Sequence, residues 1–361
     1  MIKSFDEVFE DVTKLGVKMK TDEYHPIGKY QIIDQGQEAV AGYSDLEDGV
    51  FENVPAIVFG DHTRIVKYVD QPFFLGADGV KVLRSRFKDA NYRYLYYALK
   101  SVKIPNTGYN RHFKWLKEAK IYYPNSEEQS KIVSILDGIS SVIEHRQQEL
   151  KKLDELVKAR FVELFGDGNH PHIALIDLII EGAGLSYGIV QPGDDGTGDM
   201  GVLRPVDMVD GKISTASIKY IDRSIGDGFK KTELYGDELL ITVRGTTGIT
   251  ALTDIRFNGM NVTRGIAVVR YDRNKINPVY LNAYLNTDES QRYIQEHTRG
   301  ATLQQINLSD LRVQQIMVPP LALQEQMAAF IEQTDKSKVV VQKALDDAQT
   351  LFDSLMQEYF G

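Results

Sequence analysis

The segment FVELFG at residues 161–166 returns in similar form as MQEYFG at residues 356–361, 195 positions later. Leu156 matches Leu351 at the same spacing. Further matches are Pro124 with Pro319, Tyr94-Leu95 with Tyr280-Leu281, and Glu128-Gln129 with Glu325-Gln326, the last at a spacing of 197. Because an internal repeat fixes the architecture, the sequence predicts one pattern written twice: a variable body, a proline and a long helix.

A heptad pattern of apolar residues follows the proline in both repeats. Steps of four and three residues from Ile132 and from Met327 reach apolar side chains at eight of ten positions in each helix. So narrow a stripe is typical of a coiled-coil seam rather than of a helix packed on a globular core. The residues predicted to form the helix–helix spacer are Ile132, Leu136, Ile139, Ile143, Leu150, Leu153, Val157, Ile331, Val341, Leu345, Phe352 and Leu355.

The two stripes predict that the long helices pack against each other, because neither can bury its stripe alone. If a pseudo-two-fold axis relates the repeats, the helices run antiparallel and hold the bodies at opposite ends. The alternative is that each helix packs on its own body. Ser126 followed by Gln129 predicts a capping box at the first helix, and Gly166 and Gly361 are predicted as the C-cap glycines of the first and the second helix.

The sequence outside the long helices predicts two α+β bodies, one before the first helix and one between the two. Short β-like runs alternate with glycine turns, at 30–34, 56–60, 64–69 and 80–85 and again at 218–222, 237–245 and 265–272. A short helix follows in each body, at 91–101 and 277–287, and curled antiparallel sheets are expected. The predicted segments are body one at 1–123, a long helix at 124–167, body two at 168–317 and a second long helix at 318–361. The fold class is therefore two pseudo-repeated mixed α/β domains separated by two long antiparallel coiled-coil helices.

Composition narrows the setting of the chain. It has no cysteine, so it has no disulfide framework, and no apolar run approaches the 18 residues of a membrane span. We therefore expect a cytoplasmic protein without membrane contact. The net charge of −9 argues against a nucleic-acid partner, but residues 51–120 carry 13 lysines and arginines against 6 acidic residues. Because the local field decides whether phosphates approach, this basic block predicts either a nucleic-acid surface or a basic patch without a partner.

Polar loops in both bodies carry side chains suited to DNA. YNRHFK at 109–114 contains cations beside aromatic rings, and RGATLQQ at 299–305 contains amide groups that can pair with adenine. The alternative for both loops is a merely solvated surface, and Tyr94, Tyr97 and Leu99 are expected in the core. No catalytic or metal site is predicted, since His170 and His172 lie in the linker of a chain without cysteine ligands and Asn277-Pro278 is typical of a helix start. The chain is interpreted as a binding protein and not as an enzyme.

Taken together, these features resemble the specificity subunit of type I restriction–modification systems over essentially the whole chain. In the bodies the similar stretches are FGDHTRIVKYVDQPFFLGADGVKVL (59–83), GDELLITVRGTTG (236–248), NVTRGIAVVRYD (261–272) and GATLQQINLSDL (300–311). The long helices begin with PNSEEQSKIVSIL (124–136) and PPLALQEQMAAFI (319–331), which look like the family's two helical regions.

The resemblance implies a division of labour. Each body would be a target-recognition domain that recognises one half of a split site in double-stranded DNA, and the helices would set the gap between the halves. The helices would also dock methyltransferase subunits, usually two, and a restriction subunit with ATP-driven translocation can join. No cofactor is expected on this prokaryotic chain itself, since S-adenosylmethionine, Mg²⁺ and ATP would belong to the partner subunits.

The resemblance also directs the choice of DNA-contacting residues toward cations and amides of the recognition domains. In body one they are Arg64, Arg84, Arg86, Tyr109, Asn110, Arg111, His112 and Lys114. In body two they are Arg204, Arg244, Thr246, Thr247, Asn261, Arg264, Arg299 and Gln304.

Two other functions fit the same sequence. One is the specificity subunit of another split restriction–modification system, such as a two-subunit type II enzyme, which the neighbouring genes would reveal. The other is a coiled-coil scaffold protein that binds partner proteins and no DNA, which a salt titration of DNA binding would reveal.

Overall fold

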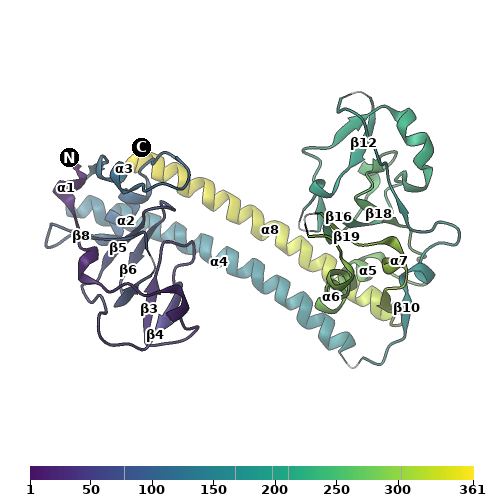
Figure 1. Cartoon of the computed structure of the whole chain (residues 1–361), viewed down its shortest axis with the longest axis horizontal. Helices are drawn as coiled ribbons and strands as arrows, with labels where there is room; N and C mark the ends of the chain where they lie inside the picture. The colour runs from purple at the N-terminus through teal and green to yellow at the C-terminus, as the bar shows by residue number, and fades with distance from the viewer. Residues whose placement is uncertain (77, 167, 197, 210, 302) are drawn as a thin grey trace. The chain divides into compact units, whose positions relative to one another are not determined.

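The computed structural model describes residues 1–76, 78–166, 168–196, 198–209, 211–301 and 303–361. Unit 1 comprises Met1–Glu149 and Val341–Gly361, and unit 2 comprises Leu150–Val340. Both boundaries fall inside the long helices α4 (Ser126–Phe165) and α8 (Leu321–Phe360) of Figure 1. Position 167, the predicted end of the first long segment, lies outside the described residues. Among the described residues, no helix is long and apolar enough to cross a membrane.

The described residues of unit 1 form short strands and, besides the long-helix segments, three α-helices and two 3-10 helices. Its elements are β1 (Ile2–Ser4), α1 (Phe5–Val8), β2 (Phe9–Asp11), β3 (Tyr30–Ile33), β4 (Gly42–Ser44), β5 (Ala56–Gly60), β6 (Val66–Val69), β7 (Phe73–Leu75), β8 (Val80–Ser85), α2 (Tyr92–Lys100), α3 (Phe113–Lys117) and β9 (Lys120–Tyr122). The predicted strands at 30–34, 56–60, 64–69 and 80–85 and the predicted helix at 91–101 are all present, with bounds that differ by at most two residues.

Unit 2 repeats this plan with added elements. It contains β10 (His172–Ala174), β11 (Ser186–Tyr187), β12 (Met200–Leu203), β13 (Met208–Val209), β14 (Lys212–Ile213), β15 (Lys219–Ile221), the 3-10 helix η5 (Arg223–Thr232), β16 (Leu239–Leu252), β17 (Asn261–Val262), β18 (Ile266–Val269), α5 (Pro278–Leu285), α6 (Asp288–His297), β19 (Gln304–Gln305), α7 (Leu308–Arg312) and β20 (Gln315–Met317). Asn277 caps α5 through its side chain and Pro278 is its first residue, as predicted. The sequence did not predict α6.

The two units have the same strand topology. Their four-stranded sheets have the orders β2-β8-β5-β6 and β11-β18-β16-β19, and their three-stranded sheets have the orders β4-β3-β7 and β15-β12-β17. In each three-stranded sheet the central strand has one antiparallel and one parallel neighbour. The parallel pairs β3–β7 and β12–β17 therefore correct the expectation of purely antiparallel sheets.

Strand β16 folds back on itself and is the counterpart of the β5–β6 hairpin. The N–H of Thr253 donates to the carbonyl of Glu238 at 2.8 Å. The N–H of Ile249 donates to the hydroxyl of Thr242 at 2.9 Å. The turn of this hairpin consequently lies at residues 244–247, where Gly245 adopts a φ of 88° that favours glycine.

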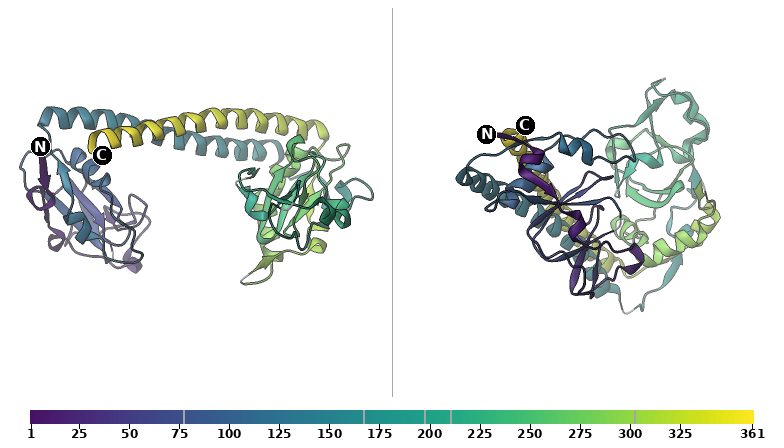
Figure 2. Two further views of the ribbon diagram at one scale, coloured as in Figure 1. Left: turned by 90° about the horizontal axis from the view of Figure 1, so that it is seen from above. Right: turned by 60° about the vertical axis from the view of Figure 1, so that its left-hand side comes forward.

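The core of each unit holds a short helix between a sheet and the long-helix segments. In unit 1, Tyr94, Tyr97 and Leu99 of α2 are buried as predicted, in a cluster that includes Phe59 of β5 and Leu136 of α4. In unit 2, the α5 tyrosines Tyr280 and Tyr284 lie in a cluster with Ile241, Phe165 and Met327. Figure 2 shows, for each unit taken by itself, the long-helix segments along one side of the body.

The heptad stripe lies at the contact between the long helices: of the twelve predicted spacer residues, Ile132, Leu136, Val341 and Phe352 are buried and the others are half-buried. Polar positions of the stripe find partners. In unit 2, Lys338 of α8 forms an ion pair with Asp154 of α4 at 2.7 Å. Further along α4, the guanidinium of Arg160 lies 5.8 Å from the ring centre of Phe330. Because the residue number rises along α4 while it falls along α8, the two helices pack antiparallel.

The starts of the long helices correct two expectations. Asn125, not Ser126, caps α4, because its side chain accepts the N–H of Glu128 at 2.9 Å. The side chain of Gln129 donates instead to the carbonyl of Pro124 at 3.0 Å. The side chain of Gln324 makes the same contact with Pro319 at 2.7 Å. Gln129 therefore corresponds to Gln324, at the spacing of 195, and not to Gln326.

Candidate nucleic-acid interface

Each unit places a hairpin turn beside the loop that leads to a short helix. In unit 1 the turn at residues 61–64 joins β5 to β6 and lies beside the loop at 104–112, which precedes α3. In unit 2 the turn at 244–247 lies beside the loop at 298–307, which precedes α7. Position 302 of the second loop lies outside the described residues. We call these the turn and the loop of each unit, and most of the predicted DNA contacts fall on them.

The loop of unit 1 presents an aromatic ring and cations to solvent. Tyr109 is 86% exposed. Its ring stacks on that of His62, with 4.5 Å between the ring centres and 6° between the ring planes. Neighbouring Asn110 and Arg111 are exposed, and within the described residues no ion pair neutralises Arg111. Lys114 follows in α3 with its amine 4.1 Å from the ring centre of Trp115. Such side chains can contact phosphates, sugars and base edges.

The turn and loop of unit 2 bring cations and an amide to the end of the four-stranded sheet. Arg244 is paired in register with Gln305, and the next pair joins Gly245 to Gln304. Arg264 is next to Gly265, whose carbonyl accepts the N–H of Val243 at 2.8 Å. Among the described residues, neither Arg244 nor Arg264 has a carboxylate partner, so both charges are available to an outside anion. Thr246 is exposed at the turn itself.

Four other predicted arginines interact with acidic groups of the chain. Arg84 forms an ion pair with Glu10 on the neighbouring strand at 2.5 Å, and Arg86 lies 3.9 Å from the same carboxylate. Arg204 pairs with the buried Asp207 at 3.0 Å, and this hydrogen-bonded carboxylate raises the pKa of the guanidinium. The fourth is the highly exposed Arg299 in the loop of unit 2, whose guanidinium lies 3.7 Å from the carboxylate of Asp310.

These pairs divide the predicted arginines by how readily they could meet DNA. A phosphate would have to compete with an internal carboxylate at Arg84, Arg86 and Arg204, whereas Arg111, Arg244 and Arg264 hold no such partner among the described residues. Arg64 is intermediate, because its guanidinium donates to the carbonyl of Ile104 at 3.4 Å and bears no ion pair in the described part of the chain.

Three predicted contacts are buried and support the site from within. His112 is 0% exposed, and its Nδ1 donates to the carbonyl of Asp61 at 3.0 Å. Asn261 accepts the hydroxyl of Thr232 at 2.8 Å, and Thr247 shares a hydrogen bond with Thr298 at 3.0 Å. We therefore no longer expect these side chains to contact DNA, because their polar groups are buried: His112 and Thr247 join a turn to a loop, and Asn261 joins β17 to η5.

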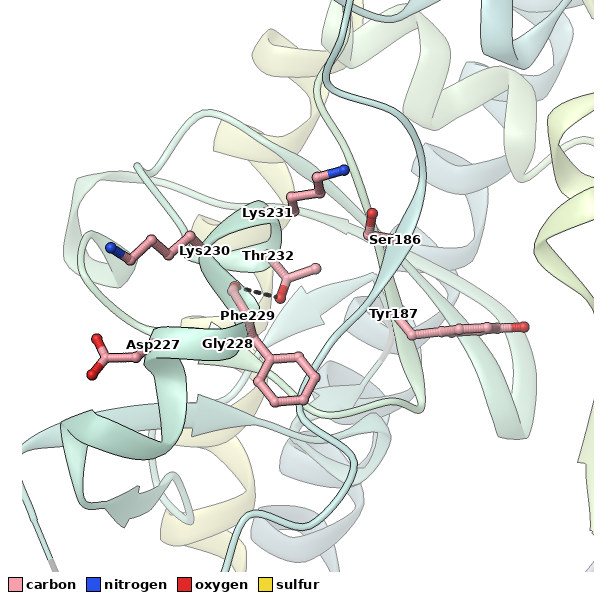
Figure 3. A pocket seen from close by; sticks show the side chains of 8 residues that line it. All are labelled: Ser186, Tyr187, Asp227, Gly228, Phe229, Lys230, Lys231 and Thr232. Atoms are coloured by element: carbon pink, nitrogen blue, oxygen red, sulfur yellow. Dashed lines mark hydrogen bonds between the residues drawn. The ribbon is translucent and has the colours of Figure 1, made fainter.

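Sequence reasoning missed Asp61 and His62, although both belong to the quoted stretch FGDHTR. It also missed a cavity of about 400 Å³ in unit 2, between β11 and η5, to which Lys230 and Lys231 belong. Figure 3 shows the side chains of Asp227 and Lys230 on one side of this cavity and those of Ser186 and Tyr187 on the other. Neither lysine forms an ion pair within the described residues, so their ammonium groups could donate hydrogen bonds to phosphate oxygens.

The chain is similar to proteins of one kind. Two curated relatives from Escherichia coli are the specificity subunits of the type I restriction enzymes EcoBI, 24% identical over 173 residues, and EcoR124I/EcoR124II, 26% identical over 155 residues. These alignments cover 48% and 39% of this chain but only 36% and 38% of the relatives. The chain therefore aligns with little more than a third of each curated relative.

A solved structure shares the fold over the full length of the chain. It is the crystal structure of the S subunit of a type I restriction–modification system from M. genitalium, with a TM-score of 0.63 and 17% identity. The match covers 100% of this chain and 96% of that one. The model of the type I restriction modification DNA specificity domain matches residues 1–155 and 199–347, which is most of the chain. The chain therefore belongs to the family of type I restriction modification DNA specificity domains.

Proposed function

We propose that this chain is the non-catalytic DNA-specificity subunit of a type I restriction–modification enzyme and recognises a bipartite DNA site. The observation that carries the proposal is the recurrence of one turn-and-loop arrangement in both units with different side chains. Unit 1 offers Tyr109 and Arg111, whereas unit 2 offers Arg244, Arg264 and Gln304. The same scaffold with different polar groups suits two unlike half-sites, since the pattern of donors and acceptors in the major groove distinguishes base pairs.

The electrostatics of these surfaces agree with the proposal. The net charge of the chain is −9, yet Arg111 in unit 1 and Arg244 and Arg264 in unit 2 form no ion pair with a carboxylate among the described residues. Each such cation that meets a phosphate releases a counterion, so binding should weaken steeply as salt increases. A scaffold protein that binds no DNA would have no need for this arrangement.

The proposal extends to partner subunits that dock on the long helices. Leu156 of α4 and Leu351 of α8 occupy equivalent places in the repeat and are 49% and 50% exposed. One lies in unit 2 and the other in unit 1. An exposed leucine on a helix is a typical anchor for another protein, and its occurrence in both units supports two methyltransferase subunits per chain. A restriction subunit would complete the enzyme, and S-adenosylmethionine, Mg²⁺ and ATP would be bound by these partners.

The test is the methylation pattern of the host. Sequencing that detects methylated adenine should show a bipartite motif that disappears when the gene for this chain is deleted and returns when it is restored. A motif that persists after deletion would refute the proposal. In a gel shift of the chain with its methyltransferase partner, an absent or salt-independent shift would instead favour the scaffold function.

A further inference from the structure

The turn of unit 1 contacts the neighbouring loop through three of its four residues. Asp61 contacts His112 and Phe113, His62 contacts Tyr109 and Asn110, and Arg64 contacts Ile104. The fourth residue, Thr63, donates its hydroxyl to the carbonyl of Gln35 at 2.6 Å. The turn therefore contacts the loop at its beginning, middle and end, and Gln35 fixes the turn through Thr63.

Asp61 makes the shortest hydrogen bonds between the turn and the segment from Ile104 to Phe113, and its side chain is buried. Its carboxylate accepts the N–H of Phe113 at 2.7 Å, and its carbonyl accepts the N–H of His112 at 2.7 Å. The N–H of Asp61 donates to the carbonyl of Gly79 at 2.7 Å. A buried carboxylate is costly unless it is hydrogen-bonded, so the Phe113 contact is strongly favoured in the folded chain.

Hydrogen bonds within the loop add to its contacts with the turn: the side chain of Asn110 donates to the carbonyl of Thr107 at 2.5 Å, and that of Asn106 accepts the N–H of Gly108 at 3.2 Å. Ile104 is half-buried, and every side chain from Pro105 to Arg111 is exposed. A segment without buried apolar side chains gains no packing energy from its conformation, so hydrogen bonds and the ring stack must decide where it lies. Arg64 adopts a φ of 64°, which is uncommon for a residue other than glycine, and this backbone places its guanidinium at the carbonyl of Ile104.

We propose that Asp61 and His62 are positioning residues for DNA recognition, because they fix the loop of unit 1 so that Tyr109 and Arg111 are presented in one conformation. The inference rests on the proposed function and adds the residues that make one half-site specific. One face of the Tyr109 ring is covered by His62, and the rest is free. A ring and a cation already held in place lose less entropy on binding, and this preorganisation sharpens discrimination between base pairs.

The test uses the full chain assembled with its methyltransferase partner and a library of random duplexes, from which bound DNA is recovered and sequenced. The variants are Asp61→Ala and His62→Ala, with Asp61→Asn as the conservative replacement, whose amide oxygen can still accept the Phe113 N–H. Asp70→Ala is the matched control, because Asp70 is an exposed aspartate that follows β6 at the other end of the hairpin.

We expect Asp61→Ala and His62→Ala to lower discrimination in the same half of the motif by roughly tenfold, while the other half keeps its preference. Asp61→Asn should retain most of the discrimination, and Asp70→Ala all of it. Unchanged discrimination in both halves, or an equal loss in both, would overturn the inference. If the unaltered complex selects no bipartite motif, the proposed function fails instead, so the two failures are distinguishable.

Hydrogen exchange provides a second measurement that needs no DNA. In Asp61→Ala the amide of Phe113 should exchange faster than in the parent chain, whereas in Asp70→Ala it should not. An unchanged exchange rate would refute the contact independently of any binding assay. If Asp61→Ala does not fold, His62→Ala decides the question, because the half-buried His62 contacts the loop and Gln35 and takes no part in the hydrophobic core.

Discussion

The ring of Phe165, near the end of α4, lies 5.3 Å from the ring of Tyr280 in α5, with the two planes inclined at 71°. In the other unit Phe360, near the end of α8, lies 5.5 Å from Tyr94 in α2. Both phenylalanines belong to the repeated segments FVELFG and MQEYFG. The repeat therefore encodes the same contact twice: the end of a long helix packs on a tyrosine of the short helix.

Replacing Phe165 by alanine should lower the free energy of unfolding of unit 2 by about 3–5 kcal/mol, because the side chain is buried in a well-packed cluster. Phe360→Ala should cost less, about 1–2 kcal/mol, since its ring is only partly buried. Urea unfolding followed by circular dichroism would measure both. Equal losses for the two variants would show that burial does not set the cost.

Replacing Arg111 by alanine should weaken DNA binding of the complex without unfolding the chain. If Arg111 meets a phosphate, the slope of log affinity against log salt should fall by about 1. Arg84→Ala is the matched control, because the Arg84 guanidinium pairs with Glu10 and should contribute less to binding. Fluorescence anisotropy with salt titration would measure the slopes. The same slope for Arg111→Ala and the parent chain would remove Arg111 from the interface.

Replacing Leu156 or Leu351 by glutamate should prevent one methyltransferase subunit from docking, because a charge at an apolar anchor must be desolvated. Each single variant should therefore form a complex with one partner subunit, and the double variant with none. Mass photometry or analytical ultracentrifugation would count the subunits. Two bound subunits in the double variant would place the docking surface elsewhere on the chain.

The stability of unit 1 should fall at alkaline pH. Burial and a hydrogen bond to the carboxylate of Asp137 raise the pKa of Tyr97 to about 12, from 10.0 for a free tyrosine. A folded-state pKa above the unfolded value stabilises the fold fully below about pH 10, and this stabilisation is lost as pH rises toward 12. Urea unfolding between pH 8 and 11.5 should show the loss, and Tyr97→Phe should show less of it. An identical pH profile for both would contradict the prediction.

Much of the fold could be predicted because it depends on periodic patterns. The heptad spacing from Ile132 and Met327 indicated two long helices, and the repeated Tyr-Leu pairs indicated where the short core helices lie. Side chains at this spacing lie on one face of a helix, so the spacing alone is enough to predict the helix and the face that packs. The alignment of Gln129 with Gln326 was wrong because sequence identity does not show which glutamine makes the equivalent hydrogen bond. The contact with the preceding proline identifies Gln324 as the counterpart of Gln129.

The candidate site was less predictable because it depends on contacts between distant segments. Arg84 and Glu10 are opposite each other only through the register of β2 on β8, which no local pattern reveals. His112 was placed on an exposed loop because it is polar, but the carbonyl of Asp61, 51 residues earlier, satisfies its ring nitrogen in the interior. Burial of a polar residue follows from its partner, and the partner is known only once the chain has folded.

Unit 1 encloses residues from distant parts of the chain in one core. Phe5, Phe59 and Tyr94 share a cluster with Phe352, and the ring of Phe360 packs on Tyr94. During synthesis these early residues leave the ribosome long before α8 exists, so the part of their apolar surface that Phe352 and Phe360 cover stays exposed until α8 is made. Because contacts between residues this far apart in the chain form slowly, the core of unit 1 is expected to complete its packing only after α8 has been synthesised.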